Sequence, residues 1–236
     1  MTFKEFGWHT GRKLIYPALP PKMRLPFFYW LSLVAGFIEP ELQCLEAICA
    51  ARKVAIDVGA NMGMFSYRLA RIFRRVYAFE INDEPLDNLI AYNPGNIEIV
   101  NIGLSSLEDE TTLYIPVCDN LPLTGWGSLS PDNCPEAQTH LTKSGRVRPL
   151  DSYSLKDVSF IKIDVEGHEA EVLQGAAGTI SANRPVVLVE VKVRNREKIL
   201  SFFTERDYTE TSLERICGVV GSPENRIFLP REGQDN

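Results

Sequence analysis

The sequence lacks several features that would assign it to a common class. Its five cysteines form no CxxC pair, which argues against a disulfide framework or a cysteine zinc site and favours reduced thiols in the cytoplasm. The formal net charge is −6, so the chain has no general attraction to nucleic-acid phosphates. The longest apolar stretch, Leu25 to Ile38, contains Pro26 and Ser32 and falls short of the roughly 20 residues that span a bilayer. We expect a cytoplasmic protein without a transmembrane segment and without a nucleic-acid partner.

Two nucleotide-binding motifs are also missing. The segment Val54 to Phe65 reads VAIDVGANMGMF and carries Asn61 and Met64 where a dinucleotide fingerprint needs its second and third glycines. No G-x-x-x-x-G-K-[ST] sequence occurs either, so the sequence gives no support for a P-loop nucleotide site. The glycine-rich segment is therefore not expected to bind NAD, FAD or a nucleoside triphosphate.

The chain is long enough for one well-buried domain, because it has 236 residues of which 44% are hydrophobic. We divide it into an N-terminal extension or cap over residues 1–38, a main domain over 39–230 and a polar tail over 231–236. The extension either packs on the main domain, or caps an active site, or forms a patch for an anionic acceptor or a peripheral membrane contact. Its basic residues, which outnumber the single acid Glu5, are Lys4, Arg12, Lys13, Lys22 and Arg24.

After an expected helix over Glu39 to Ala51, strand and helix patterns alternate, which predicts an α/β protein with a mainly parallel sheet covered on both faces. The expected strands are Lys53 to Val58, Val76 to Phe79, Ile97 to Asn101, Phe160 to Val165 and Pro185 to Val193, with two short ones over 208–212 and 226–229. The expected helices are Met62 to Phe73, Glu84 to Tyr92, His168 to Ala182 and Arg196 to Glu205.

Between Glu108 and Pro149 this alternation stops. We expect a strand over Thr111 to Pro116 and then a loop over Val117 to Gly145, and loops of such length are commonly lids or binding segments. Within it, Trp126 and Ser128 belong to LTGWGSLSP. Trp126 is suited to stacking on a sugar ring or to closing over the cofactor; alternatively, it is a plug that excludes solvent. We predict that Trp126 and Ser128 belong to a lid or contact the substrate.

A parallel strand that ends in glycines and restarts as a helix marks the sheet edge where open α/β sheets bind ligands. Here the turn reads Asp57-x-Gly59-x-Asn61-x-Gly63, which resembles the glycine turn of class I S-adenosylmethionine methyltransferases. In such a turn the acid can hold the ammonium group of the cofactor directly or through water, and the glycines allow close approach of the backbone. Glu80 follows Gly59 by 21 residues, at the end of the next strand, where an acid can accept both ribose hydroxyls. The expected cofactor contacts are Asp57, Gly59, Ala60, Asn61, Gly63 and Glu80.

Two later segments sharpen this resemblance. FIKIDVEGHEAEVLQGA at 160–176 and PVVLVEV at 185–191 identify the stretch from Val54 to Val191 as similar to the FkbM family of S-adenosylmethionine-dependent methyltransferases. The resemblance implies a Rossmann-like class I fold, with a seven-stranded sheet whose final hairpin is antiparallel. It also implies methyl transfer to a hydroxyl of a sugar, a lipid-linked or a natural-product acceptor. Leu104 and Ser105 take the positions expected to contact adenine.

A hydroxyl becomes a good nucleophile only when a base removes its proton or a metal lowers its pKa. Asp164 and Glu166 end the fourth strand, His168 begins the next helix and Glu190 ends the fifth strand. Our hypothesis is that Asp164 or Glu166 orients the acceptor hydroxyl, with Asp164 also near the cofactor, and that His168 is the base. Alternatively, His168 is a structural hydrogen-bond partner. A divalent cation on Asp164, Glu166 and Glu190 is a further alternative, which we do not predict.

The function expected from these residues is S-adenosylmethionine-dependent O-methylation of a small acceptor, a sugar, glycan or natural product. Methylation of adenine nitrogen is disfavoured because the segment after the fourth strand reads Asp-Val-Glu-Gly and not N-P-P-Y. Two alternatives stay open: an N-methyltransferase of RNA or protein, and a non-catalytic binding protein on the same fold.

Overall fold

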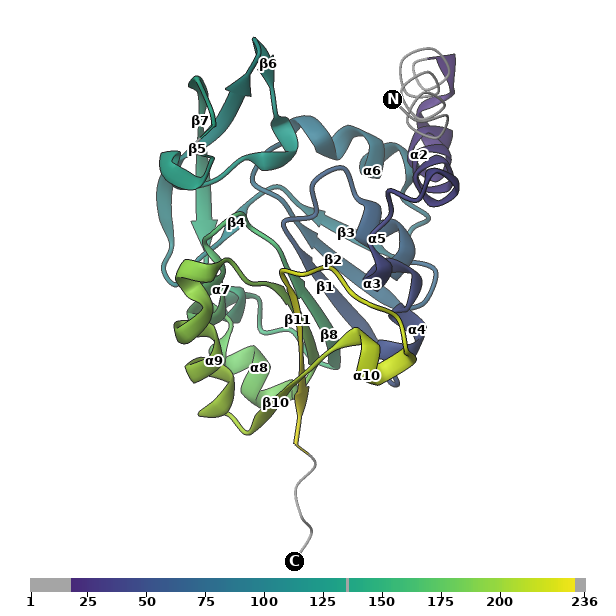
Figure 1. Cartoon of the computed structure of the whole chain (residues 1–236), viewed down its shortest axis with the longest axis vertical. Coiled ribbons are helices and arrows are strands. Elements are labelled where there is room, and N and C mark those ends of the chain that lie inside the picture. Colours follow the sequence, from purple (N-terminus) through teal and green to yellow (C-terminus); the bar gives the residue numbers. More distant parts are fainter. Residues whose placement is uncertain (1–17, 135, 232–236) are drawn as a thin grey trace, which may run out of the picture.

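The computed structural model describes residues 18–134 and 136–231. They are organised around a seven-stranded sheet with the strand order β10-β11-β9-β8-β1-β2-β3 (Figure 1). All neighbouring strands are parallel except β11, which runs antiparallel to both β9 and β10. This confirms the predicted mostly parallel sheet with an antiparallel last hairpin. The strands are β1 (Val54–Val58), β2 (Arg75–Phe79), β3 (Ile97–Val100), β8 (Val158–Ile163), β9 (Val186–Glu190), β10 (Tyr208–Thr211) and β11 (Asn225–Pro230).

Helices cover both faces of this sheet, as predicted (Figure 1). In the central strand β1 all five residues are buried, and its side chains alternate between the two faces: Ala55 belongs to one core and Ile56 to the other. The first core packs under α2 (Pro21–Ala35), α3 (Pro40–Gln43), α4 (Leu45–Ile48), α5 (Met64–Leu69), α6 (Asp87–Tyr92) and α10 (Leu213–Cys217). The second packs under α7 (Glu169–Gly175), α8 (Ala177–Asn183) and α9 (Arg196–Thr204).

Several element boundaries differ from those predicted. The expected helix over 39–51 is two short helices, and the one expected over 168–182 is interrupted at Ala176. Helix α5 begins only at Met64, because Gly63 has a φ of 94°. Strand β9 ends at Glu190 and is followed by a short 3-10 helix, and α10 was not predicted at all.

The predicted loop over 117–145 is wrong. Strands β5 (Asp109–Cys118) and β7 (Thr139–Arg148) form a long antiparallel hairpin, which joins β4 (Gly103–Leu104) and β6 (Leu121–Pro122) in a second sheet. The sequence of β7, THLTKSGRVR, has one fully buried residue, Val147, so it carries no hydrophobic alternation that would have marked a strand. Apart from the short helices η4 (Thr124–Trp126) and η5 (Pro131–Asn133), the connection between β6 and β7 is irregular in its described residues.

The described part of the N-terminal extension is helical and packs on the main domain. Leu25 and Phe28 of α2 are buried, and the rings of Tyr29 and Tyr67 lie 4.9 Å apart. Over residues 18–134 and 136–231, no helix is long and apolar enough to cross a membrane. The predicted tail falls almost entirely outside the described residues.

Candidate functional site

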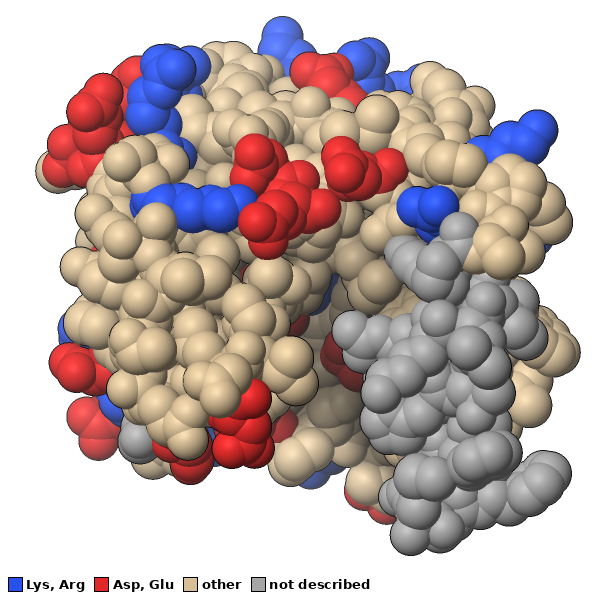
Figure 2. All heavy atoms as spheres, turned by 90° about the horizontal axis from the view of Figure 1, so that it is seen from above, with Lys and Arg blue, Asp and Glu red and all other residues tan. Residues whose placement is uncertain are grey.

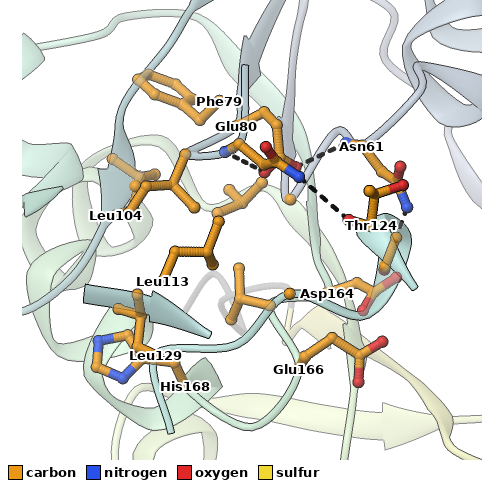
Figure 3. Close-up of a pocket in the computed structure, with 18 residues that line it drawn as sticks. Asn61, Phe79, Glu80, Leu104, Leu113, Thr124, Leu129, Asp164, Glu166 and His168 are labelled. Carbon is orange, nitrogen blue, oxygen red and sulfur yellow. Dashed lines mark hydrogen bonds between the residues drawn. The ribbon is translucent and has the colours of Figure 1, made fainter. Parts of the chain in front are cut away.

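A pocket lies where β1, β2 and β8 end, under the second sheet (Figure 3). Because these strands are parallel, the residues that follow them meet at one sheet edge, and the pocket is lined by Gly59, Glu80 and Asp164. The second sheet and the segment after β6 close the pocket from above, through Leu113, Gly125, Gly127 and Leu129. Further lining residues are Val58, Asn61, Phe79, Ile81, Asn82, Gly103, Leu104, Thr124, Val165, Glu166 and His168.

The glycine turn after β1 requires glycine at both predicted positions. Gly59 has a φ of 74°, and a Cβ there would lie 1.8 Å from the carbonyl oxygen of Asp164. At Gly63 a Cβ would lie 2.8 Å from a methyl group of Leu89. Every backbone N–H of the turn already donates to a protein acceptor: Gly59 and Ala60 to Phe79 O, Asn61 to Glu80, Met62 to Asn61 Oδ1 and Gly63 to Ala60 O. The turn therefore offers no free N–H groups to a phosphate, in agreement with the missing nucleotide motifs.

Glu80 is fixed by the main chain on both sides. Its Oε2 accepts a hydrogen bond from the N–H of Asn61 at 2.8 Å, and its Oε1 accepts one from the N–H of Asn82 at 2.8 Å (Figure 3). Burial raises the pKa of Glu80 above its usual value, and the two N–H groups partly oppose that rise. A carboxylate oxygen can accept more than one hydrogen bond, so both oxygens keep the capacity to bind a hydroxyl in the pocket.

Asp57 does not line the pocket, which argues against the predicted direct contact between Asp57 and the cofactor. Its side chain is fully buried, Oδ2 accepts a 2.6 Å hydrogen bond from the hydroxyl of Ser66, and Oδ1 lies 3.8 Å from Lys162 Nζ. Lys162 in turn donates to Gly59 O at 3.2 Å and to Asp164 Oδ2 at 3.1 Å. Burial lowers the pKa of Lys162, but the carboxylates of Asp164 and Asp57 outweigh burial and hold it above its usual value. Lys162 was not predicted as a site residue, although a single charged residue in the apolar strand segment FIKI indicates a buried charge with a partner.

The backbone and the hydrogen bonds of Asn61 explain why asparagine can replace the middle glycine of the turn. Its φ is 50°, a conformation that asparagine tolerates, and its Oδ1 accepts a hydrogen bond from Met62 N at 2.7 Å. The other side-chain atom, Nδ2, donates to Gly125 O at 3.3 Å, while Asn82 Nδ2 donates to Thr124 O at 3.2 Å. Two asparagines of the pocket floor thus hold the η4 segment over the pocket.

The two predicted lid residues have different positions. Trp126 is 55% exposed and does not line the pocket; it borders a neighbouring hollow beside Met62 and Phe28. Ser128 is buried, and its hydroxyl donates to the backbone oxygen of Glu166 at 2.8 Å. Ser128 therefore supports the turn that carries Glu166.

His168 lies on the opposite side of the pocket from Asp164 and Glu166, beside Leu129 (Figure 3). Its Nε2 is 2.9 Å from the hydroxyl of Ser105, and its Nδ1 is 3.6 Å from Glu171. Burial lowers the pKa of His168, which favours the neutral ring. The structure thus brings His168 together with the predicted adenine contacts Leu104 and Ser105, and not with the acids, so its expected role as base lacks the expected geometry.

The three predicted acids do meet. Oxygens of Asp164, Glu166 and Glu190 lie within 4.8 Å of one another. Burial and the neighbouring carboxylate of Asp164 raise the pKa of Glu190 to about 9, so Glu190 is protonated at neutral pH. Burial raises the pKa of Asp164, but Lys162 and the hydrogen bond with Glu190 outweigh it and hold this pKa below its usual value. The pair therefore shares one proton and one negative charge.

A lysine compensates the remaining charge of this cluster. Lys192 Nζ lies 3.1 Å from Glu190, 3.6 Å from Glu166 and 3.0 Å from Glu224. Three carboxylates are a donor set suited to a divalent cation, but the ammonium groups of Lys162 and Lys192 already lie against them. We assign no metal to the cluster.

Glu166 is held in an unusual backbone conformation. It has a φ of 53°, and Gly167 after it has a φ of 99°; non-glycine residues in this region are often found at functional sites. Besides Ser128, the turn is held by Asn195 Nδ2, which donates to Gly167 O at 3.0 Å, and by Asn133 Nδ2, which donates to Glu166 Oε2 at 3.2 Å. Burial and Asp164 raise the pKa of Glu166.

The sequence and the fold are similar to those of known proteins. A family model described as the methyltransferase FkbM domain matches residues 57–210. The hexuronic acid methyltransferase AglP of Haloferax volcanii is 30% identical over 152 residues, which cover 61% of the chain and 60% of AglP. The AMB antimetabolite synthetase AmbE of Pseudomonas aeruginosa is 28% identical over 224 residues, which cover 76% of the chain and 10% of AmbE. The chain therefore spans less than two thirds of the length of either curated relative.

A solved structure has the same fold. The crystal structure of a methyltransferase FkbM from Methylobacillus flagellatus superimposes with a TM-score of 0.56 at 14% identity, covering 97% of the chain and 62% of that protein. At this identity the likeness concerns the fold alone.

Proposed function

The chain belongs to the methyltransferase FkbM domain family, whose cofactor is S-adenosylmethionine, and we propose that it transfers the methyl group to a hydroxyl of a small acceptor. The observation that carries this proposal is a single pocket with Glu80 at the end of one strand and Asp164 and Glu166 beyond the end of another. We propose a sugar, a glycan or a natural product as the acceptor, as the sequence predicts.

The pocket fits the three parts of this cofactor. Its apolar side, with Phe79, Leu104 and Leu113, suits the adenine ring (Figure 3). His168, whose Nε2 lies 2.9 Å from the hydroxyl of Ser105, also lines the pocket. Glu80 is oriented to accept the two ribose hydroxyls. Gly59 and the ionised Asp164 lie on the side where we place the positively charged methionine part. We therefore keep Gly59, Asn61, Glu80 and Leu104 as direct cofactor contacts and assign Asp57, Ala60 and Gly63 to shaping the turn.

We assign the proton transfer to Glu166 and no longer to His168. A general base works best when its pKa approaches the working pH, and the pKa of Glu166 is raised from the usual carboxylate value. The bound cofactor supplies an electrophilic methyl group on its sulfonium. Glu80 and Gly59 would hold the cofactor, and Glu166 would take the proton of the acceptor hydroxyl as this methyl group passes to it, which would leave S-adenosylhomocysteine. Asp164 orients the hydroxyl, and the protonated Glu190 fixes Asp164.

The relatives support a small acceptor. AglP is described as a hexuronic acid methyltransferase, and AmbE as an antimetabolite synthetase, so neither name points to RNA or protein. A cytoplasmic location stays a prediction, in keeping with the five cysteines, which are all free.

The test has two steps. First, S-adenosylhomocysteine should raise the melting temperature of the protein, whereas NAD should not. Second, methyl-tritiated S-adenosylmethionine is added with the protein to a cell extract that is then separated into small molecules, glycans, protein and nucleic acid. Label in the first two fractions, stable to protease and nuclease, supports the proposal. Label in protein or RNA would replace the acceptor class by that of an N-methyltransferase, and a missing thermal shift would favour a non-catalytic binding protein.

A further inference from the structure

Helix α2 is apolar on two faces, and only one of them is covered. Leu25, Phe28 and Ser32 form the inner face and are buried against the domain. From Met23 to Phe37, every exposed residue is apolar or glycine, as the burial of each residue shows. The exposed fractions are 49% for Met23, 57% for Trp30, 39% for Leu33 and 57% for Val34. A helix that is hydrophobic all round is normally buried in a protein or in a membrane.

The charge that helix α2 itself carries has one sign, and its outer face is defined here by Met23, Trp30, Leu33 and Val34. Helix α2 contains no acid, and its two charged residues, Lys22 and Arg24, lie in its first turn. Residues 1–38 contain five basic residues and one acid, while the remaining sequence contains 20 basic residues and 30 acids. The N-terminal segment is therefore basic in a chain that is acidic as a whole, and of these five basic residues the structure describes Lys22 and Arg24, at the start of α2. On the face shown in Figure 2, by contrast, acidic and basic side chains lie close together.

Apolar and aromatic side chains flanked by lysine and arginine match the surface of a membrane with anionic lipids. Tryptophan is favoured at the membrane interface, and each basic residue near an anionic surface adds to the attraction. With 15 residues, α2 is too short to span a bilayer but long enough to lie in its interface. We propose that the outer face of α2 binds the surface of a membrane that contains anionic lipids.

The position of α2 connects this surface to the pocket. Phe28, on its inner face, borders the same hollow as Asn61 and Thr124, which take part in closing the pocket. Helix α2 therefore borders the hollow beside the η4 segment. The membrane proposal does not depend on the acceptor, and it stands or falls with lipid binding alone.

The experiment is flotation of the full chain with vesicles of phosphatidylcholine alone and of phosphatidylcholine mixed with phosphatidylglycerol. We expect flotation with the anionic vesicles, weak flotation with the neutral ones, and release at about 0.5 M sodium chloride, because salt screens the charges. Equal flotation with both vesicles, or none with either, would overturn the proposal.

Matched variants locate the contact. The double variant Leu33→Ser and Val34→Ser should weaken binding at least tenfold, because it removes two apolar side chains from the membrane contact. The control Leu107→Ser and Val220→Ser removes the same kinds of side chain at exposed positions outside α2 and should bind like the wild type. Lys22→Gln removes one positive charge and should weaken binding about fivefold.

Circular dichroism and the melting temperature check that each variant folds. Equal losses in the two double variants would mean that α2 is not the contact. Sedimentation of the wild type in the absence of lipid measures its oligomeric state. If the wild type is a dimer and the double variant Leu33→Ser and Val34→Ser is a monomer, the outer face binds a second copy of the chain and the proposal is overturned.

Discussion

The two acidic sides of the pocket are built differently. Glu80 is held by two main-chain N–H groups that lie within 19 residues of it in the sequence. Glu166 is held by side chains from distant segments: Ser128 and Asn133 before β7, and Lys192 after β9. Main-chain donors survive most substitutions, whereas side-chain donors do not. We infer that cofactor binding at Glu80 is robust, and that chemistry at Glu166 depends on the second sheet and can be lost separately.

The largest expected effect is at Glu166. Glu166→Gln keeps the size and the hydrogen bond with Asn133 but removes the base, so turnover should fall by about two to four orders of magnitude. Binding of S-adenosylhomocysteine, measured by calorimetry, should stay within about threefold. Asp132→Asn changes an exposed acid nearby and serves as the control. Unchanged turnover would remove Glu166 from the mechanism.

Lys162 links the two sides, because it contacts both Gly59 O and Asp164. Lys162→Met leaves buried carboxylates without their cation and should lower the free energy of unfolding by about 3 to 5 kcal/mol. Lys143→Met, which removes a lysine from more exposed ion pairs with Asp83 and Glu84, should cost less than about 1 kcal/mol. Urea unfolding of both variants measures the difference, and equal losses would contradict the role given to Lys162.

At the cofactor side, Glu80→Gln should weaken binding of S-adenosylhomocysteine about 10- to 100-fold, because it removes charge-assisted hydrogen bonds to the ribose. Asp87→Asn, at an exposed acid seven residues further, should bind normally. Calorimetry of the two variants separates the cofactor site from general electrostatics. A Glu80→Gln protein with wild-type affinity would move the ribose elsewhere.

The last effect is a dependence of the stability of the fold on pH, which arises from Glu190. Its folded pKa of about 9 lies above the usual 4.5, so the folded state keeps a proton that the unfolded state has lost. The stability due to this proton is complete below the usual pKa and is lost as pH rises toward about 9. Glu190→Gln stays neutral, so at pH about 8 it should be more stable than the wild type, by an amount that grows as pH rises from about 4.5 toward about 9. At pH about 4.5 the advantage should vanish, and a less stable variant at the higher pH would contradict the shared proton.

Local patterns allowed part of this molecule to be predicted. The strand and helix alternation specified the main sheet, and the spacing between Gly59 and Glu80 placed an acid on the pocket, because both signals lie within one βαβ unit. Strand β7 could not be predicted, because it is polar and pairs with β5 without a buried face of its own. The positions of the Asp57 and His168 side chains could also not be predicted from the sequence. They depend on Lys162 and Ser105, which approach from other strands.

A crystal structure of the protein with S-adenosylhomocysteine tests the central assignment most directly. Our account predicts the ribose hydroxyls on Glu80, the adenine against Leu104 and Leu113, and the sulfur facing Asp164 and Glu166. A ligand in the reverse orientation, with its sulfur beside His168, would contradict the assignment of Glu166 and return the role of base to His168.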